Sequence, residues 1–260
     1  MRDLQEFKPT PKNWKLVLGI PMLLAALVFP AAASSAVTAG TSPAEVSSGD
    51  VPRGTSEVER TTTDVPRIPL YDIDSAKSLQ VVVNKKRPLN PVEYFPRGKV
   101  QIGYSWVAKP AADAYVLLKA AVTKAKLGTL CINSGYRSYS SQTLIHDAKV
   151  ALLGKTAGEK LAARPGYSEH QTGLAMDIST TQLGCRIGAF GASRASVWIA
   201  ANAWQYGFVV RYPNGKTPIT GYVWEPWHLR FVGLELAADM KAKNIATLEE
   251  YFALPAAPRY

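Results

Sequence analysis

Two histidines and an aspartate are the residues of this sequence whose types and spacing point most directly to chemistry. His170 and Asp177 lie in the stretch GYSEHQTGLAMDIST, and His228 follows in YVWEPWHLRFVG. Asp177 falls within an apolar run that reads as a buried strand, where a carboxylate is costly unless a positive charge meets it. Two imidazoles and one carboxylate suit Zn²⁺ and leave a fourth position open for water, as in catalytic zinc sites. Each residue alone would more often be a hydrogen-bonded polar side chain, so the prediction rests on their combination.

Glu225 precedes His228 in the segment EPWH and is the predicted general base. Pro226 and the neighbouring aromatic residues favour extended chain, in which an odd separation points two side chains to opposite faces. A bend or bulge at the proline would bring both side chains into one site, where Glu225 would take a proton from the attacking water. The alternative is an ordinary salt bridge, for example with Arg230.

Arg137 ends the strand-like stretch TLCINSGYR in a turn. An arginine can hold a substrate carboxylate bidentately or stabilise an oxyanion, which suits a peptidase that acts at a free C-terminus. A lone arginine is more often an ordinary surface residue. His146, the third histidine, is expected on a helix among alanine, leucine and lysine without partners, and we do not expect it to bind metal.

The elements that must position these residues can be read from periodicity and turn signals. Residues 110–127 predict a helix with an apolar stripe through Ala114, Leu117, Leu118 and Val122. Further helices are expected at 138–154 and 194–206 and from residues 234 and 247, and strands at 79–83, 129–134, 174–178, 208–213 and 222–233. The later strands are separated by loops and hairpin-like turns rather than by a βαβ alternation. The predicted fold class is therefore α+β with a small, mostly antiparallel sheet flanked by helices.

The N-terminal part carries export information. Residues 1–33 place basic residues before an apolar segment, which predicts a signal peptide or an N-terminal membrane anchor. Whether the segment is cleaved stays open, because its length is near the lower limit for a span and its glycine and prolines weaken a helix. Residues 34–66 lack aromatic residues and read as a flexible linker, and residues 67–260 form the predicted catalytic domain. We expect an exported protein.

The composition of the chain indicates which kinds of partner it binds. The chain has 260 residues, 47% of them hydrophobic, and a formal net charge of +10. A basic exported domain favours an anionic cell wall or membrane surface, and without an aromatic-interleaved basic motif we expect no binding to nucleic acid. The oxidising location favours a disulfide between Cys131 and Cys185, the two cysteines. A cysteine nucleophile at Cys131 is a weaker alternative, and the oligomeric state is expected to be a monomer.

These residues resemble the motifs of a known family. Ser168-x-His170-x-x-Gly173-x-Ala175-x-Asp177 together with Glu225-x-Trp227-His228-x-Arg230 is similar to the zinc D-alanyl-D-alanine carboxypeptidases of the VanY type. Supporting similarity runs from VVVNKKRPLNP through SGYRSYSSQ to EPWHLRFVG, over roughly residues 80–235.

The resemblance implies a role for each motif residue. His170, Asp177 and His228 would be the ligands of one zinc ion, Glu225 the general base, and Arg137 the group that stabilises charge on the scissile carbonyl. Ser168 and Gln142 match positions that bind substrate. The implied fold is shared with the signalling domain of hedgehog proteins and with lysostaphin-like endopeptidases. The implied substrate is the stem peptide of peptidoglycan, from which a terminal D-alanine leaves.

Four alternatives to this function are considered. The same fold supports LD-carboxypeptidases, which trim the tetrapeptide, and endopeptidases that cut cross-links. A dipeptidase fits less well, because its free-dipeptide substrate is cytoplasmic. A binding module of the cell wall without turnover is the alternative from another class, and the presence of Glu225 argues against it.

Overall fold

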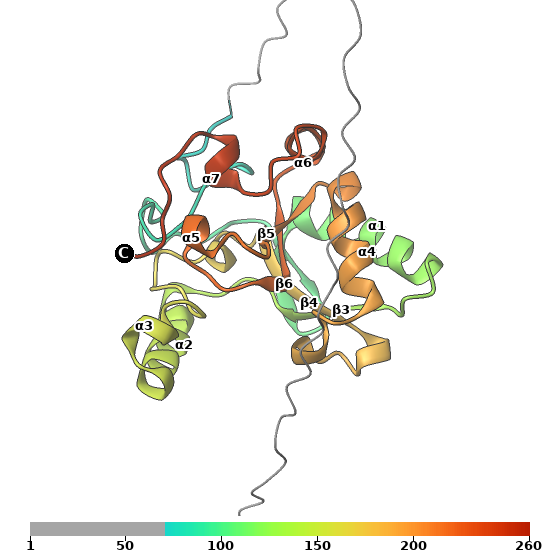
Figure 1. Cartoon of the computed structure of the whole chain (residues 1–260), viewed down its shortest axis with the longest axis horizontal. Helices are drawn as coiled ribbons and strands as arrows, with labels where there is room; N and C mark the ends of the chain where they lie inside the picture. The colour runs from blue at the N-terminus through green and yellow to red at the C-terminus, as the bar shows by residue number, and fades with distance from the viewer. Residues whose placement is uncertain (1–70) are drawn as a thin grey trace, which may run out of the picture. The chain divides into compact units, whose positions relative to one another are not determined.

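The computed structural model describes residues 71–260 (Figure 1). The predicted signal or anchor segment, 1–33, and the predicted linker, 34–66, lie outside the described residues, and the predicted domain 67–260 is described from Tyr71 onward. Within residues 71–260, no helix has the length and apolar character needed to cross a membrane.

A four-stranded antiparallel sheet forms the centre of the fold (Figure 1). Its strands are β3 (Leu130–Ser134), β4 (Ala175–Thr180), β6 (Glu225–Phe231) and β5 (Phe208–Tyr212), in that order across the sheet. A separate hairpin pairs β1 (Lys99–Ile102) with β2 (Ser105–Ala108). The prediction of an α+β fold with a small antiparallel sheet is confirmed.

Helices flank the sheet and begin at the expected signals. Ser138 and Ser193 cap the second and fourth helices, because each hydroxyl accepts a hydrogen bond from the backbone N–H three residues later. The α-helices are α1 (Lys109–Lys124), α2 (Tyr139–Leu153), α3 (Lys155–Gly158), α4 (Arg194–Asn202), α5 (Thr217–Thr220), α6 (Leu234–Ala242) and α7 (Leu248–Tyr251). Residues 71–260 also contain the 3₁₀ turns η1 (Glu169–Thr172), η2 (Thr181–Leu183), η3 (Ile187–Ala189) and η4 (Ala203–Tyr206).

The main core lies between α1, α4 and one face of the sheet, on which Met176, Ile178 and Leu229 are completely buried. Strand residues alternate between faces, so Asp177 and His228, the neighbours of these core residues in sequence, turn to the opposite face. The hydrophobic effect thereby fixes the face on which the polar residues gather.

Several local predictions are wrong. Leu117 was assigned to the buried stripe of α1 but is 62% exposed, because the helix turns Tyr115, Leu118 and Val122 to the core instead. The apolar run at 79–83 is not a strand; Val81, Val82 and Val83 are buried without a strand partner, and only an isolated bridge between Asn84 and Arg87 follows them.

Turns and helix ends also differ from the prediction. The helix expected at 194–206 finishes as the 3₁₀ turn η4, the turn after β5 contains the short helix α5, and the β1–β2 hairpin was not predicted at all. Its strands have four residues each, too few for a clear alternating pattern.

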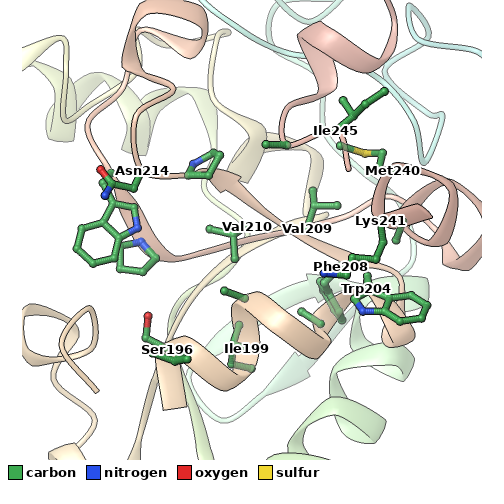
Figure 2. Close-up of a pocket in the computed structure, with 18 of the residues that line it drawn as sticks. Ser196, Ile199, Trp204, Phe208, Val209, Val210, Asn214, Met240, Lys241 and Ile245 are labelled. Atoms are coloured by element: carbon green, nitrogen blue, oxygen red, sulfur yellow. The ribbon is translucent and has the colours of Figure 1, made fainter. Parts of the chain in front are cut away.

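A groove of about 540 Å³ lies between α4 and α6. Figure 2 shows Val209 and Val210 of β5 between Ile199 on one side and Met240 on the other. Its lining is mostly apolar and includes none of the predicted site residues. The chemistry therefore belongs to a second, smaller cavity.

Candidate metal centre

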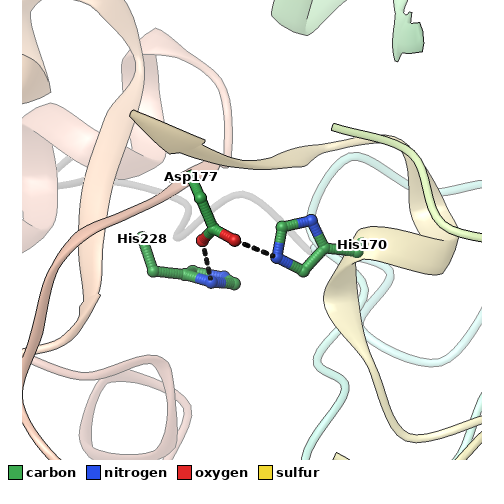
Figure 3. Close-up of side chains that lie close together, drawn as sticks. All are labelled: His170, Asp177 and His228. Atoms are coloured by element: carbon green, nitrogen blue, oxygen red, sulfur yellow. Dashed lines mark ion pairs between the residues drawn. The ribbon is translucent and has the colours of Figure 1, made fainter. Parts of the chain in front are cut away.

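The three predicted ligands come together from separate segments. His170 lies in η1, and Asp177 and His228 are directly opposed in the register of β4 and β6. His170 Nε2 lies 3.3 Å from Asp177 Oδ2, and His228 Nδ1 lies 3.2 Å from Asp177 Oδ1 (Figure 3). One ligand atom from each residue falls within 4.8 Å of the others, close enough for one metal ion to be held by all three.

The outer nitrogen of each imidazole faces a polar group that orients the ring. His170 Nδ1 is 2.8 Å from the carbonyl oxygen of Gly135. Because a carbonyl only accepts, Nδ1 carries the proton and Nε2 keeps its lone pair for a metal. His228 Nε2 faces Glu169 Oε2 at 3.5 Å, which leaves Nδ1 pointing to Asp177. Such outer partners are typical of metal-binding histidines.

Glycine is required at two positions that hold His170 in place. A Cβ on Gly135 would lie 2.4 Å from the carbonyl oxygen of Trp106, so no larger residue fits beneath the β1–β2 hairpin. Gly173 ends η1 with φ +71°, a left-handed conformation, and a Cβ there would lie 3.1 Å from the Ala108 nitrogen. These close approaches explain the glycines of the SGYR and SEHQTG segments.

The electrostatics of the cluster suit a cation. Burial alone would raise the pKa of Asp177, but the neighbouring His170 and His228 hold it well below its usual value. Burial likewise opposes the charged form of His228, but the carboxylates of Asp177 and Glu169 outweigh it and raise the pKa of His228 to about 9. Asp177 Oδ1 is buried and lacks a hydrogen-bond partner among the described residues. A buried, orphaned carboxylate oxygen between two imidazoles fits a metal ligand set of the zinc type.

Glu225 reaches the same site through an irregularity in β6. Tyr212 pairs with Glu225, and Val210 pairs with Leu229. Between these two pairs the chain advances four residues in β6 but only two in β5, so β6 contains a bulge. This bulge, at Pro226, brings Glu225 Oε2 to 3.8 Å from His228 Nδ1 despite their odd separation. Burial raises the pKa of Glu225 to about 7, which is suitable for a group that accepts and returns a proton near neutral pH. The alternative pairing of Glu225 with Arg230 is wrong, because Arg230 binds Glu169.

Arg137 is held rigidly at the edge of the cluster. Its guanidinium donates to Gln142 Oε1 at 2.7 Å and to Ser134 Oγ at 3.1 Å, and it lies 3.7 Å from Asp177 Oδ2. Gln142 is completely buried and uses its amide nitrogen to donate to the Ala163 carbonyl. The structure therefore places Gln142 behind Arg137, as a residue that orients the guanidinium, and not on the wall that would touch a substrate.

The cluster opens into a cavity of about 300 Å³. Ser168 lies in its wall, as the resemblance implies. Tyr212, Tyr222 and Trp227 add aromatic surface for which the sequence pattern predicts no role in the site. The complete lining is Arg137, Ile145, Lys149, Leu161, Ala162, Ala163, Ser168, His170, Asp177, Ile187, Tyr212, Tyr222, Glu225, Trp227 and His228.

The remaining predicted residues lie apart from the cluster. Cys131 and Cys185 are joined in a disulfide across 54 positions of sequence, which removes the thiol that a cysteine nucleophile would need. His146 is outside the ligand cluster, but the expectation that it lacks partners is wrong. Its Nδ1 lies 3.0 Å from Asp147 Oδ1, and its Nε2 lies 3.7 Å from Glu159 Oε1.

A buried charge network behind the metal ligands was not predicted. Glu169 Oε1 accepts hydrogen bonds from Arg211 Nε and Arg230 Nη1, each at 2.8 Å, and Arg211 also pairs with Glu249. All four side chains are at most 1% exposed. The available signal was an arginine inside each of two otherwise apolar strands, FVVRYP and HLRFVG, because a buried arginine needs a carboxylate.

A buried cluster of two histidines and an aspartate, with a glutamate of raised pKa and an arginine in one cavity, is the residue set of hydrolytic metal centres. Comparison with known proteins identifies its family. Residues 104–234 match the model of the VanY family, D-alanyl-D-alanine carboxypeptidase. The chain belongs to this family of carboxypeptidases and is an enzyme of the peptidoglycan-processing type.

Individual relatives agree with this assignment. The chain is 41% identical over 194 residues to the putative carboxypeptidase YodJ of Bacillus subtilis, covering 70% of each chain. Among solved structures, it is similar to the LD-carboxypeptidase LdcB, with a TM-score of 0.63 and 40% identity over 68% of this chain and 87% of that one. It also resembles a variant of the vancomycin-resistance D,D-pentapeptidase VanY in complex with Zn(II), with a TM-score of 0.57 and 32% identity over 66% of this chain and 97% of that one.

Proposed function

We propose that this protein is a zinc-dependent D-alanyl-D-alanine carboxypeptidase that removes the C-terminal D-alanine from peptidoglycan stem peptides. One zinc ion per chain would be held by His170, Asp177 and His228. The observation that carries the proposal is the position of Glu225, whose buried carboxylate opens into the same cavity as the three ligands and has a pKa raised to about 7.

The chain's own groups divide the work of hydrolysis. A bound zinc ion supplies Lewis acidity, which lowers the pKa of water and polarises a peptide carbonyl. Glu225 accepts the proton of the attacking water and returns it to the leaving amine. Arg137, fixed by Gln142 and Ser134, stabilises the negative charge that develops on the carbonyl oxygen.

The experiment is a measurement of zinc content and D-alanine release by the purified chain, beside Glu225→Gln and the control Glu250→Gln. Glu225→Gln keeps the shape of the side chain but cannot accept a proton. We expect stoichiometric zinc in all three proteins, with release reduced about 10²–10⁴-fold only in Glu225→Gln. Full release by Glu225→Gln would remove the assigned base, and absence of zinc from the parent would contradict the whole proposal.

The second candidate function is LD-carboxypeptidase activity, which removes D-alanine from the tetrapeptide. The observation in its favour is the 40% identity to the LD-carboxypeptidase LdcB, higher than the 32% to the D,D-pentapeptidase VanY. Digestion of a defined pentapeptide and a defined tetrapeptide separates the two functions. Release from the pentapeptide alone supports the first, release from the tetrapeptide alone supports the second, and release from neither contradicts both.

Two remaining alternatives predict distinct outcomes with cross-linked peptides and cell walls as substrates. An endopeptidase would cut cross-linked dimers of stem peptides and release no free D-alanine. A binding module would take up zinc and bind cell walls without cutting any peptide. The buried glutamate of raised pKa supports an enzyme over a module, because a module has no use for a poised base.

We further propose that the protein is exported and works on the cell-wall side of the membrane, either secreted or held by residues 1–33. The basic residues ahead of an apolar segment support export, and so does the disulfide, which is stable in an oxidising compartment. The excess of basic residues supports contact with an anionic wall or membrane surface. N-terminal sequencing of the mature protein from each cell fraction would test the location and the cleavage together.

A further inference from the structure

A buried lysine lies behind the wall of the catalytic cavity. Lys85 belongs to the segment VVVNKKRPLNP, which none of the assigned roles uses, and it is only 3% exposed. Its Nζ donates to the carbonyl oxygens of Glu159 and Gly221, at 2.8 and 2.5 Å. The carboxylate of Glu159 is engaged by Arg164 at 2.8 Å, so the hydrogen bonds of Lys85 go to backbone carbonyls. Burial lowers the pKa of Lys85 to about 8, so the fold bears a cost for keeping this charge inside.

The lysine holds an aromatic residue of the cavity. Its Nζ lies 4.5 Å from the centre of the Tyr222 ring, within the range of a cation–π contact. Its second carbonyl acceptor belongs to Gly221, the residue before Tyr222. Gly221 has φ +81°, and a Cβ there would lie 2.5 Å from the Ala257 carbonyl oxygen and 2.8 Å from Lys85 Cδ, so both the backbone conformation and the close packing require glycine. Lys85 thus fixes both the backbone and the ring of Tyr222.

Tyr222 in turn supports the metal ligand His228. Its ring packs on Tyr212 with a centroid distance of 4.5 Å, and Tyr212 packs on the imidazole of His228 at 4.8 Å. Both tyrosines line the cavity of about 300 Å³. A continuous stack therefore runs from Lys85 to His228, and its middle members form the wall that a bound peptide would meet.

Tyr260 contacts both Tyr222 and Lys85. Its hydroxyl lies 3.3 Å from the hydroxyl of Tyr222 and accepts a hydrogen bond from the Arg164 backbone nitrogen at 2.7 Å. The Lys85 Nζ also lies 5.6 Å from the Tyr260 ring. Tyr222 is held by a cation and a hydroxyl together, which leaves its ring little freedom to turn.

We propose that Lys85 is a positioning residue of the carboxypeptidase site, which holds Tyr222, and through it Tyr212, in the shape that receives the peptide. The inference rests on the proposed function. The wall contacts the peptide equally in the ground state and the transition state, so its loosening weakens binding without slowing the chemical step.

The test compares Lys85→Met with Lys86→Met, which removes a neighbouring exposed lysine. A third variant, Tyr260→Phe, removes the hydroxyl that supports Tyr222 and accepts from the Arg164 backbone nitrogen, and leaves Lys85 in place. For the peptide that the zinc-loaded parent cleaves, we expect Lys85→Met to raise KM about five-fold, the value of a lost cation–π contact, with kcat nearly unchanged. Tyr260→Phe should raise KM in the same direction by less, and Lys86→Met should match the parent. Zinc content should not fall in Lys85→Met, and its Tm should change little, because the removal of a buried charge offsets the loss of the two hydrogen bonds to backbone carbonyls.

A KM for Lys85→Met equal to that of Lys86→Met would overturn the inference. Loss of zinc and of Tm in step with lost activity would also overturn it, because Lys85 would then be a structural residue only. A second readout is independent of turnover: the ring protons of His228 in the NMR spectrum of the zinc-loaded protein, which the Tyr212 ring shields. These resonances should shift in Lys85→Met and not in Lys86→Met. If the parent cleaves no peptide, the proposed function fails, and this spectrum alone decides the positioning role.

Discussion

Replacement of Glu169 by glutamine tests the largest electrostatic element of the site. Glu169 is 0% exposed and lies 2.8 Å from Arg211 Nε, 2.8 Å from Arg230 Nη1 and 3.5 Å from His228 Nε2. Glutamine keeps the size of the side chain but removes its charge, so that Arg230 loses its carboxylate partner and Arg211 keeps only Glu249.

The loss of folding free energy expected for Glu169→Gln follows from the burial of its ion pairs. Breaking a buried ion pair by removing one partner costs about 3–5 kcal/mol, because the other charge stays uncompensated. At roughly 2–4 °C per kcal/mol for a domain of this size, the Tm of Glu169→Gln should fall by about 6–20 °C at pH 7. The matched control is Glu250→Gln, whose pair with Lys216 is about one-third exposed on each side and should cost less than about 1 kcal/mol.

The contribution of Glu169 to stability should decrease at low pH. Burial alone would raise the pKa of Glu169, but Arg211 and Arg230 hold it well below the ordinary value for glutamate. The stabilising contribution is therefore complete above about pH 5 and is lost as the pH falls through the range below about 4, in which the unfolded chain binds the proton first. The difference between the parent and Glu169→Gln should shrink over that interval.

The assay is thermal unfolding of both variants with zinc in excess and with chelator, combined with zinc titration against a competing dye. We expect the affinity of Glu169→Gln for zinc to fall about 10–100-fold, because His228 loses the carboxylate that orients it. Equal unfolding temperatures for Glu169→Gln and Glu250→Gln would refute the reasoning, since they would mean that the buried charges are neutralised in some other way.

Three further predictions concern other parts of the site. Replacing Cys131 and Cys185 by alanine should lower the free energy of unfolding by about 4 kcal/mol, the entropy of a loop closed across 54 positions, and an unchanged Tm would contradict it. Arg137→Lys keeps the charge but not the planar fork, so kcat should fall about 10²-fold with zinc content retained; an unchanged kcat would remove its role in charge stabilisation. The pKa of Lys85, lowered from 10.5 to about 8, penalises the charged form below pH 8, so the parent should gain up to about 3 kcal/mol relative to Lys85→Met as the pH rises from 8 to above 10. Unfolding curves at both pH values check this, and a constant difference would contradict it.

The ligand set could be predicted from sequence because its signals are local. Asp177 is a charge inside an apolar strand, His170 lies three residues before Gly173 in a polar segment, and His228 directly follows Trp227. These features depend on residue type and short-range pattern, which the fold preserves. The direct opposition of Asp177 and His228 depends on strand order and register, and no local pattern contains that information.

The sequence predicts Glu225 as the base, but only the structure shows how its side chain reaches the metal ligands. Pro226 indicated that the strand could bend, but how many residues the bulge absorbs depends on how Tyr212 and Val210 of the neighbouring strand pair with β6. Glu169 was missed for a related reason. A glutamate in a short polar turn reads as exposed, and only tertiary packing reveals that two strand arginines meet it.

The run of valines before Lys85 was predicted to be a strand, and this prediction is wrong. Three consecutive β-branched residues favour a strand locally, yet their backbone finds no neighbouring strand, and their burial comes from packing against other elements. Lys85 itself carried no functional signal in the sequence, because an isolated lysine is usually solvated. Its burial and its aromatic neighbours are products of contacts between distant segments.

The direct opposition of Asp177 and His228 across β4 and β6 has a consequence for how the enzyme assembles. A slip of one residue between these strands would turn one of the two side chains to the other face of the sheet and separate the pair. If the chain binds zinc as proposed, metal uptake would favour the correct strand pairing, because a chain in the wrong register cannot bring the three ligands together and gains no binding free energy from the metal. The proposed zinc ion would then stabilise only the alignment of the sheet in which catalysis is possible.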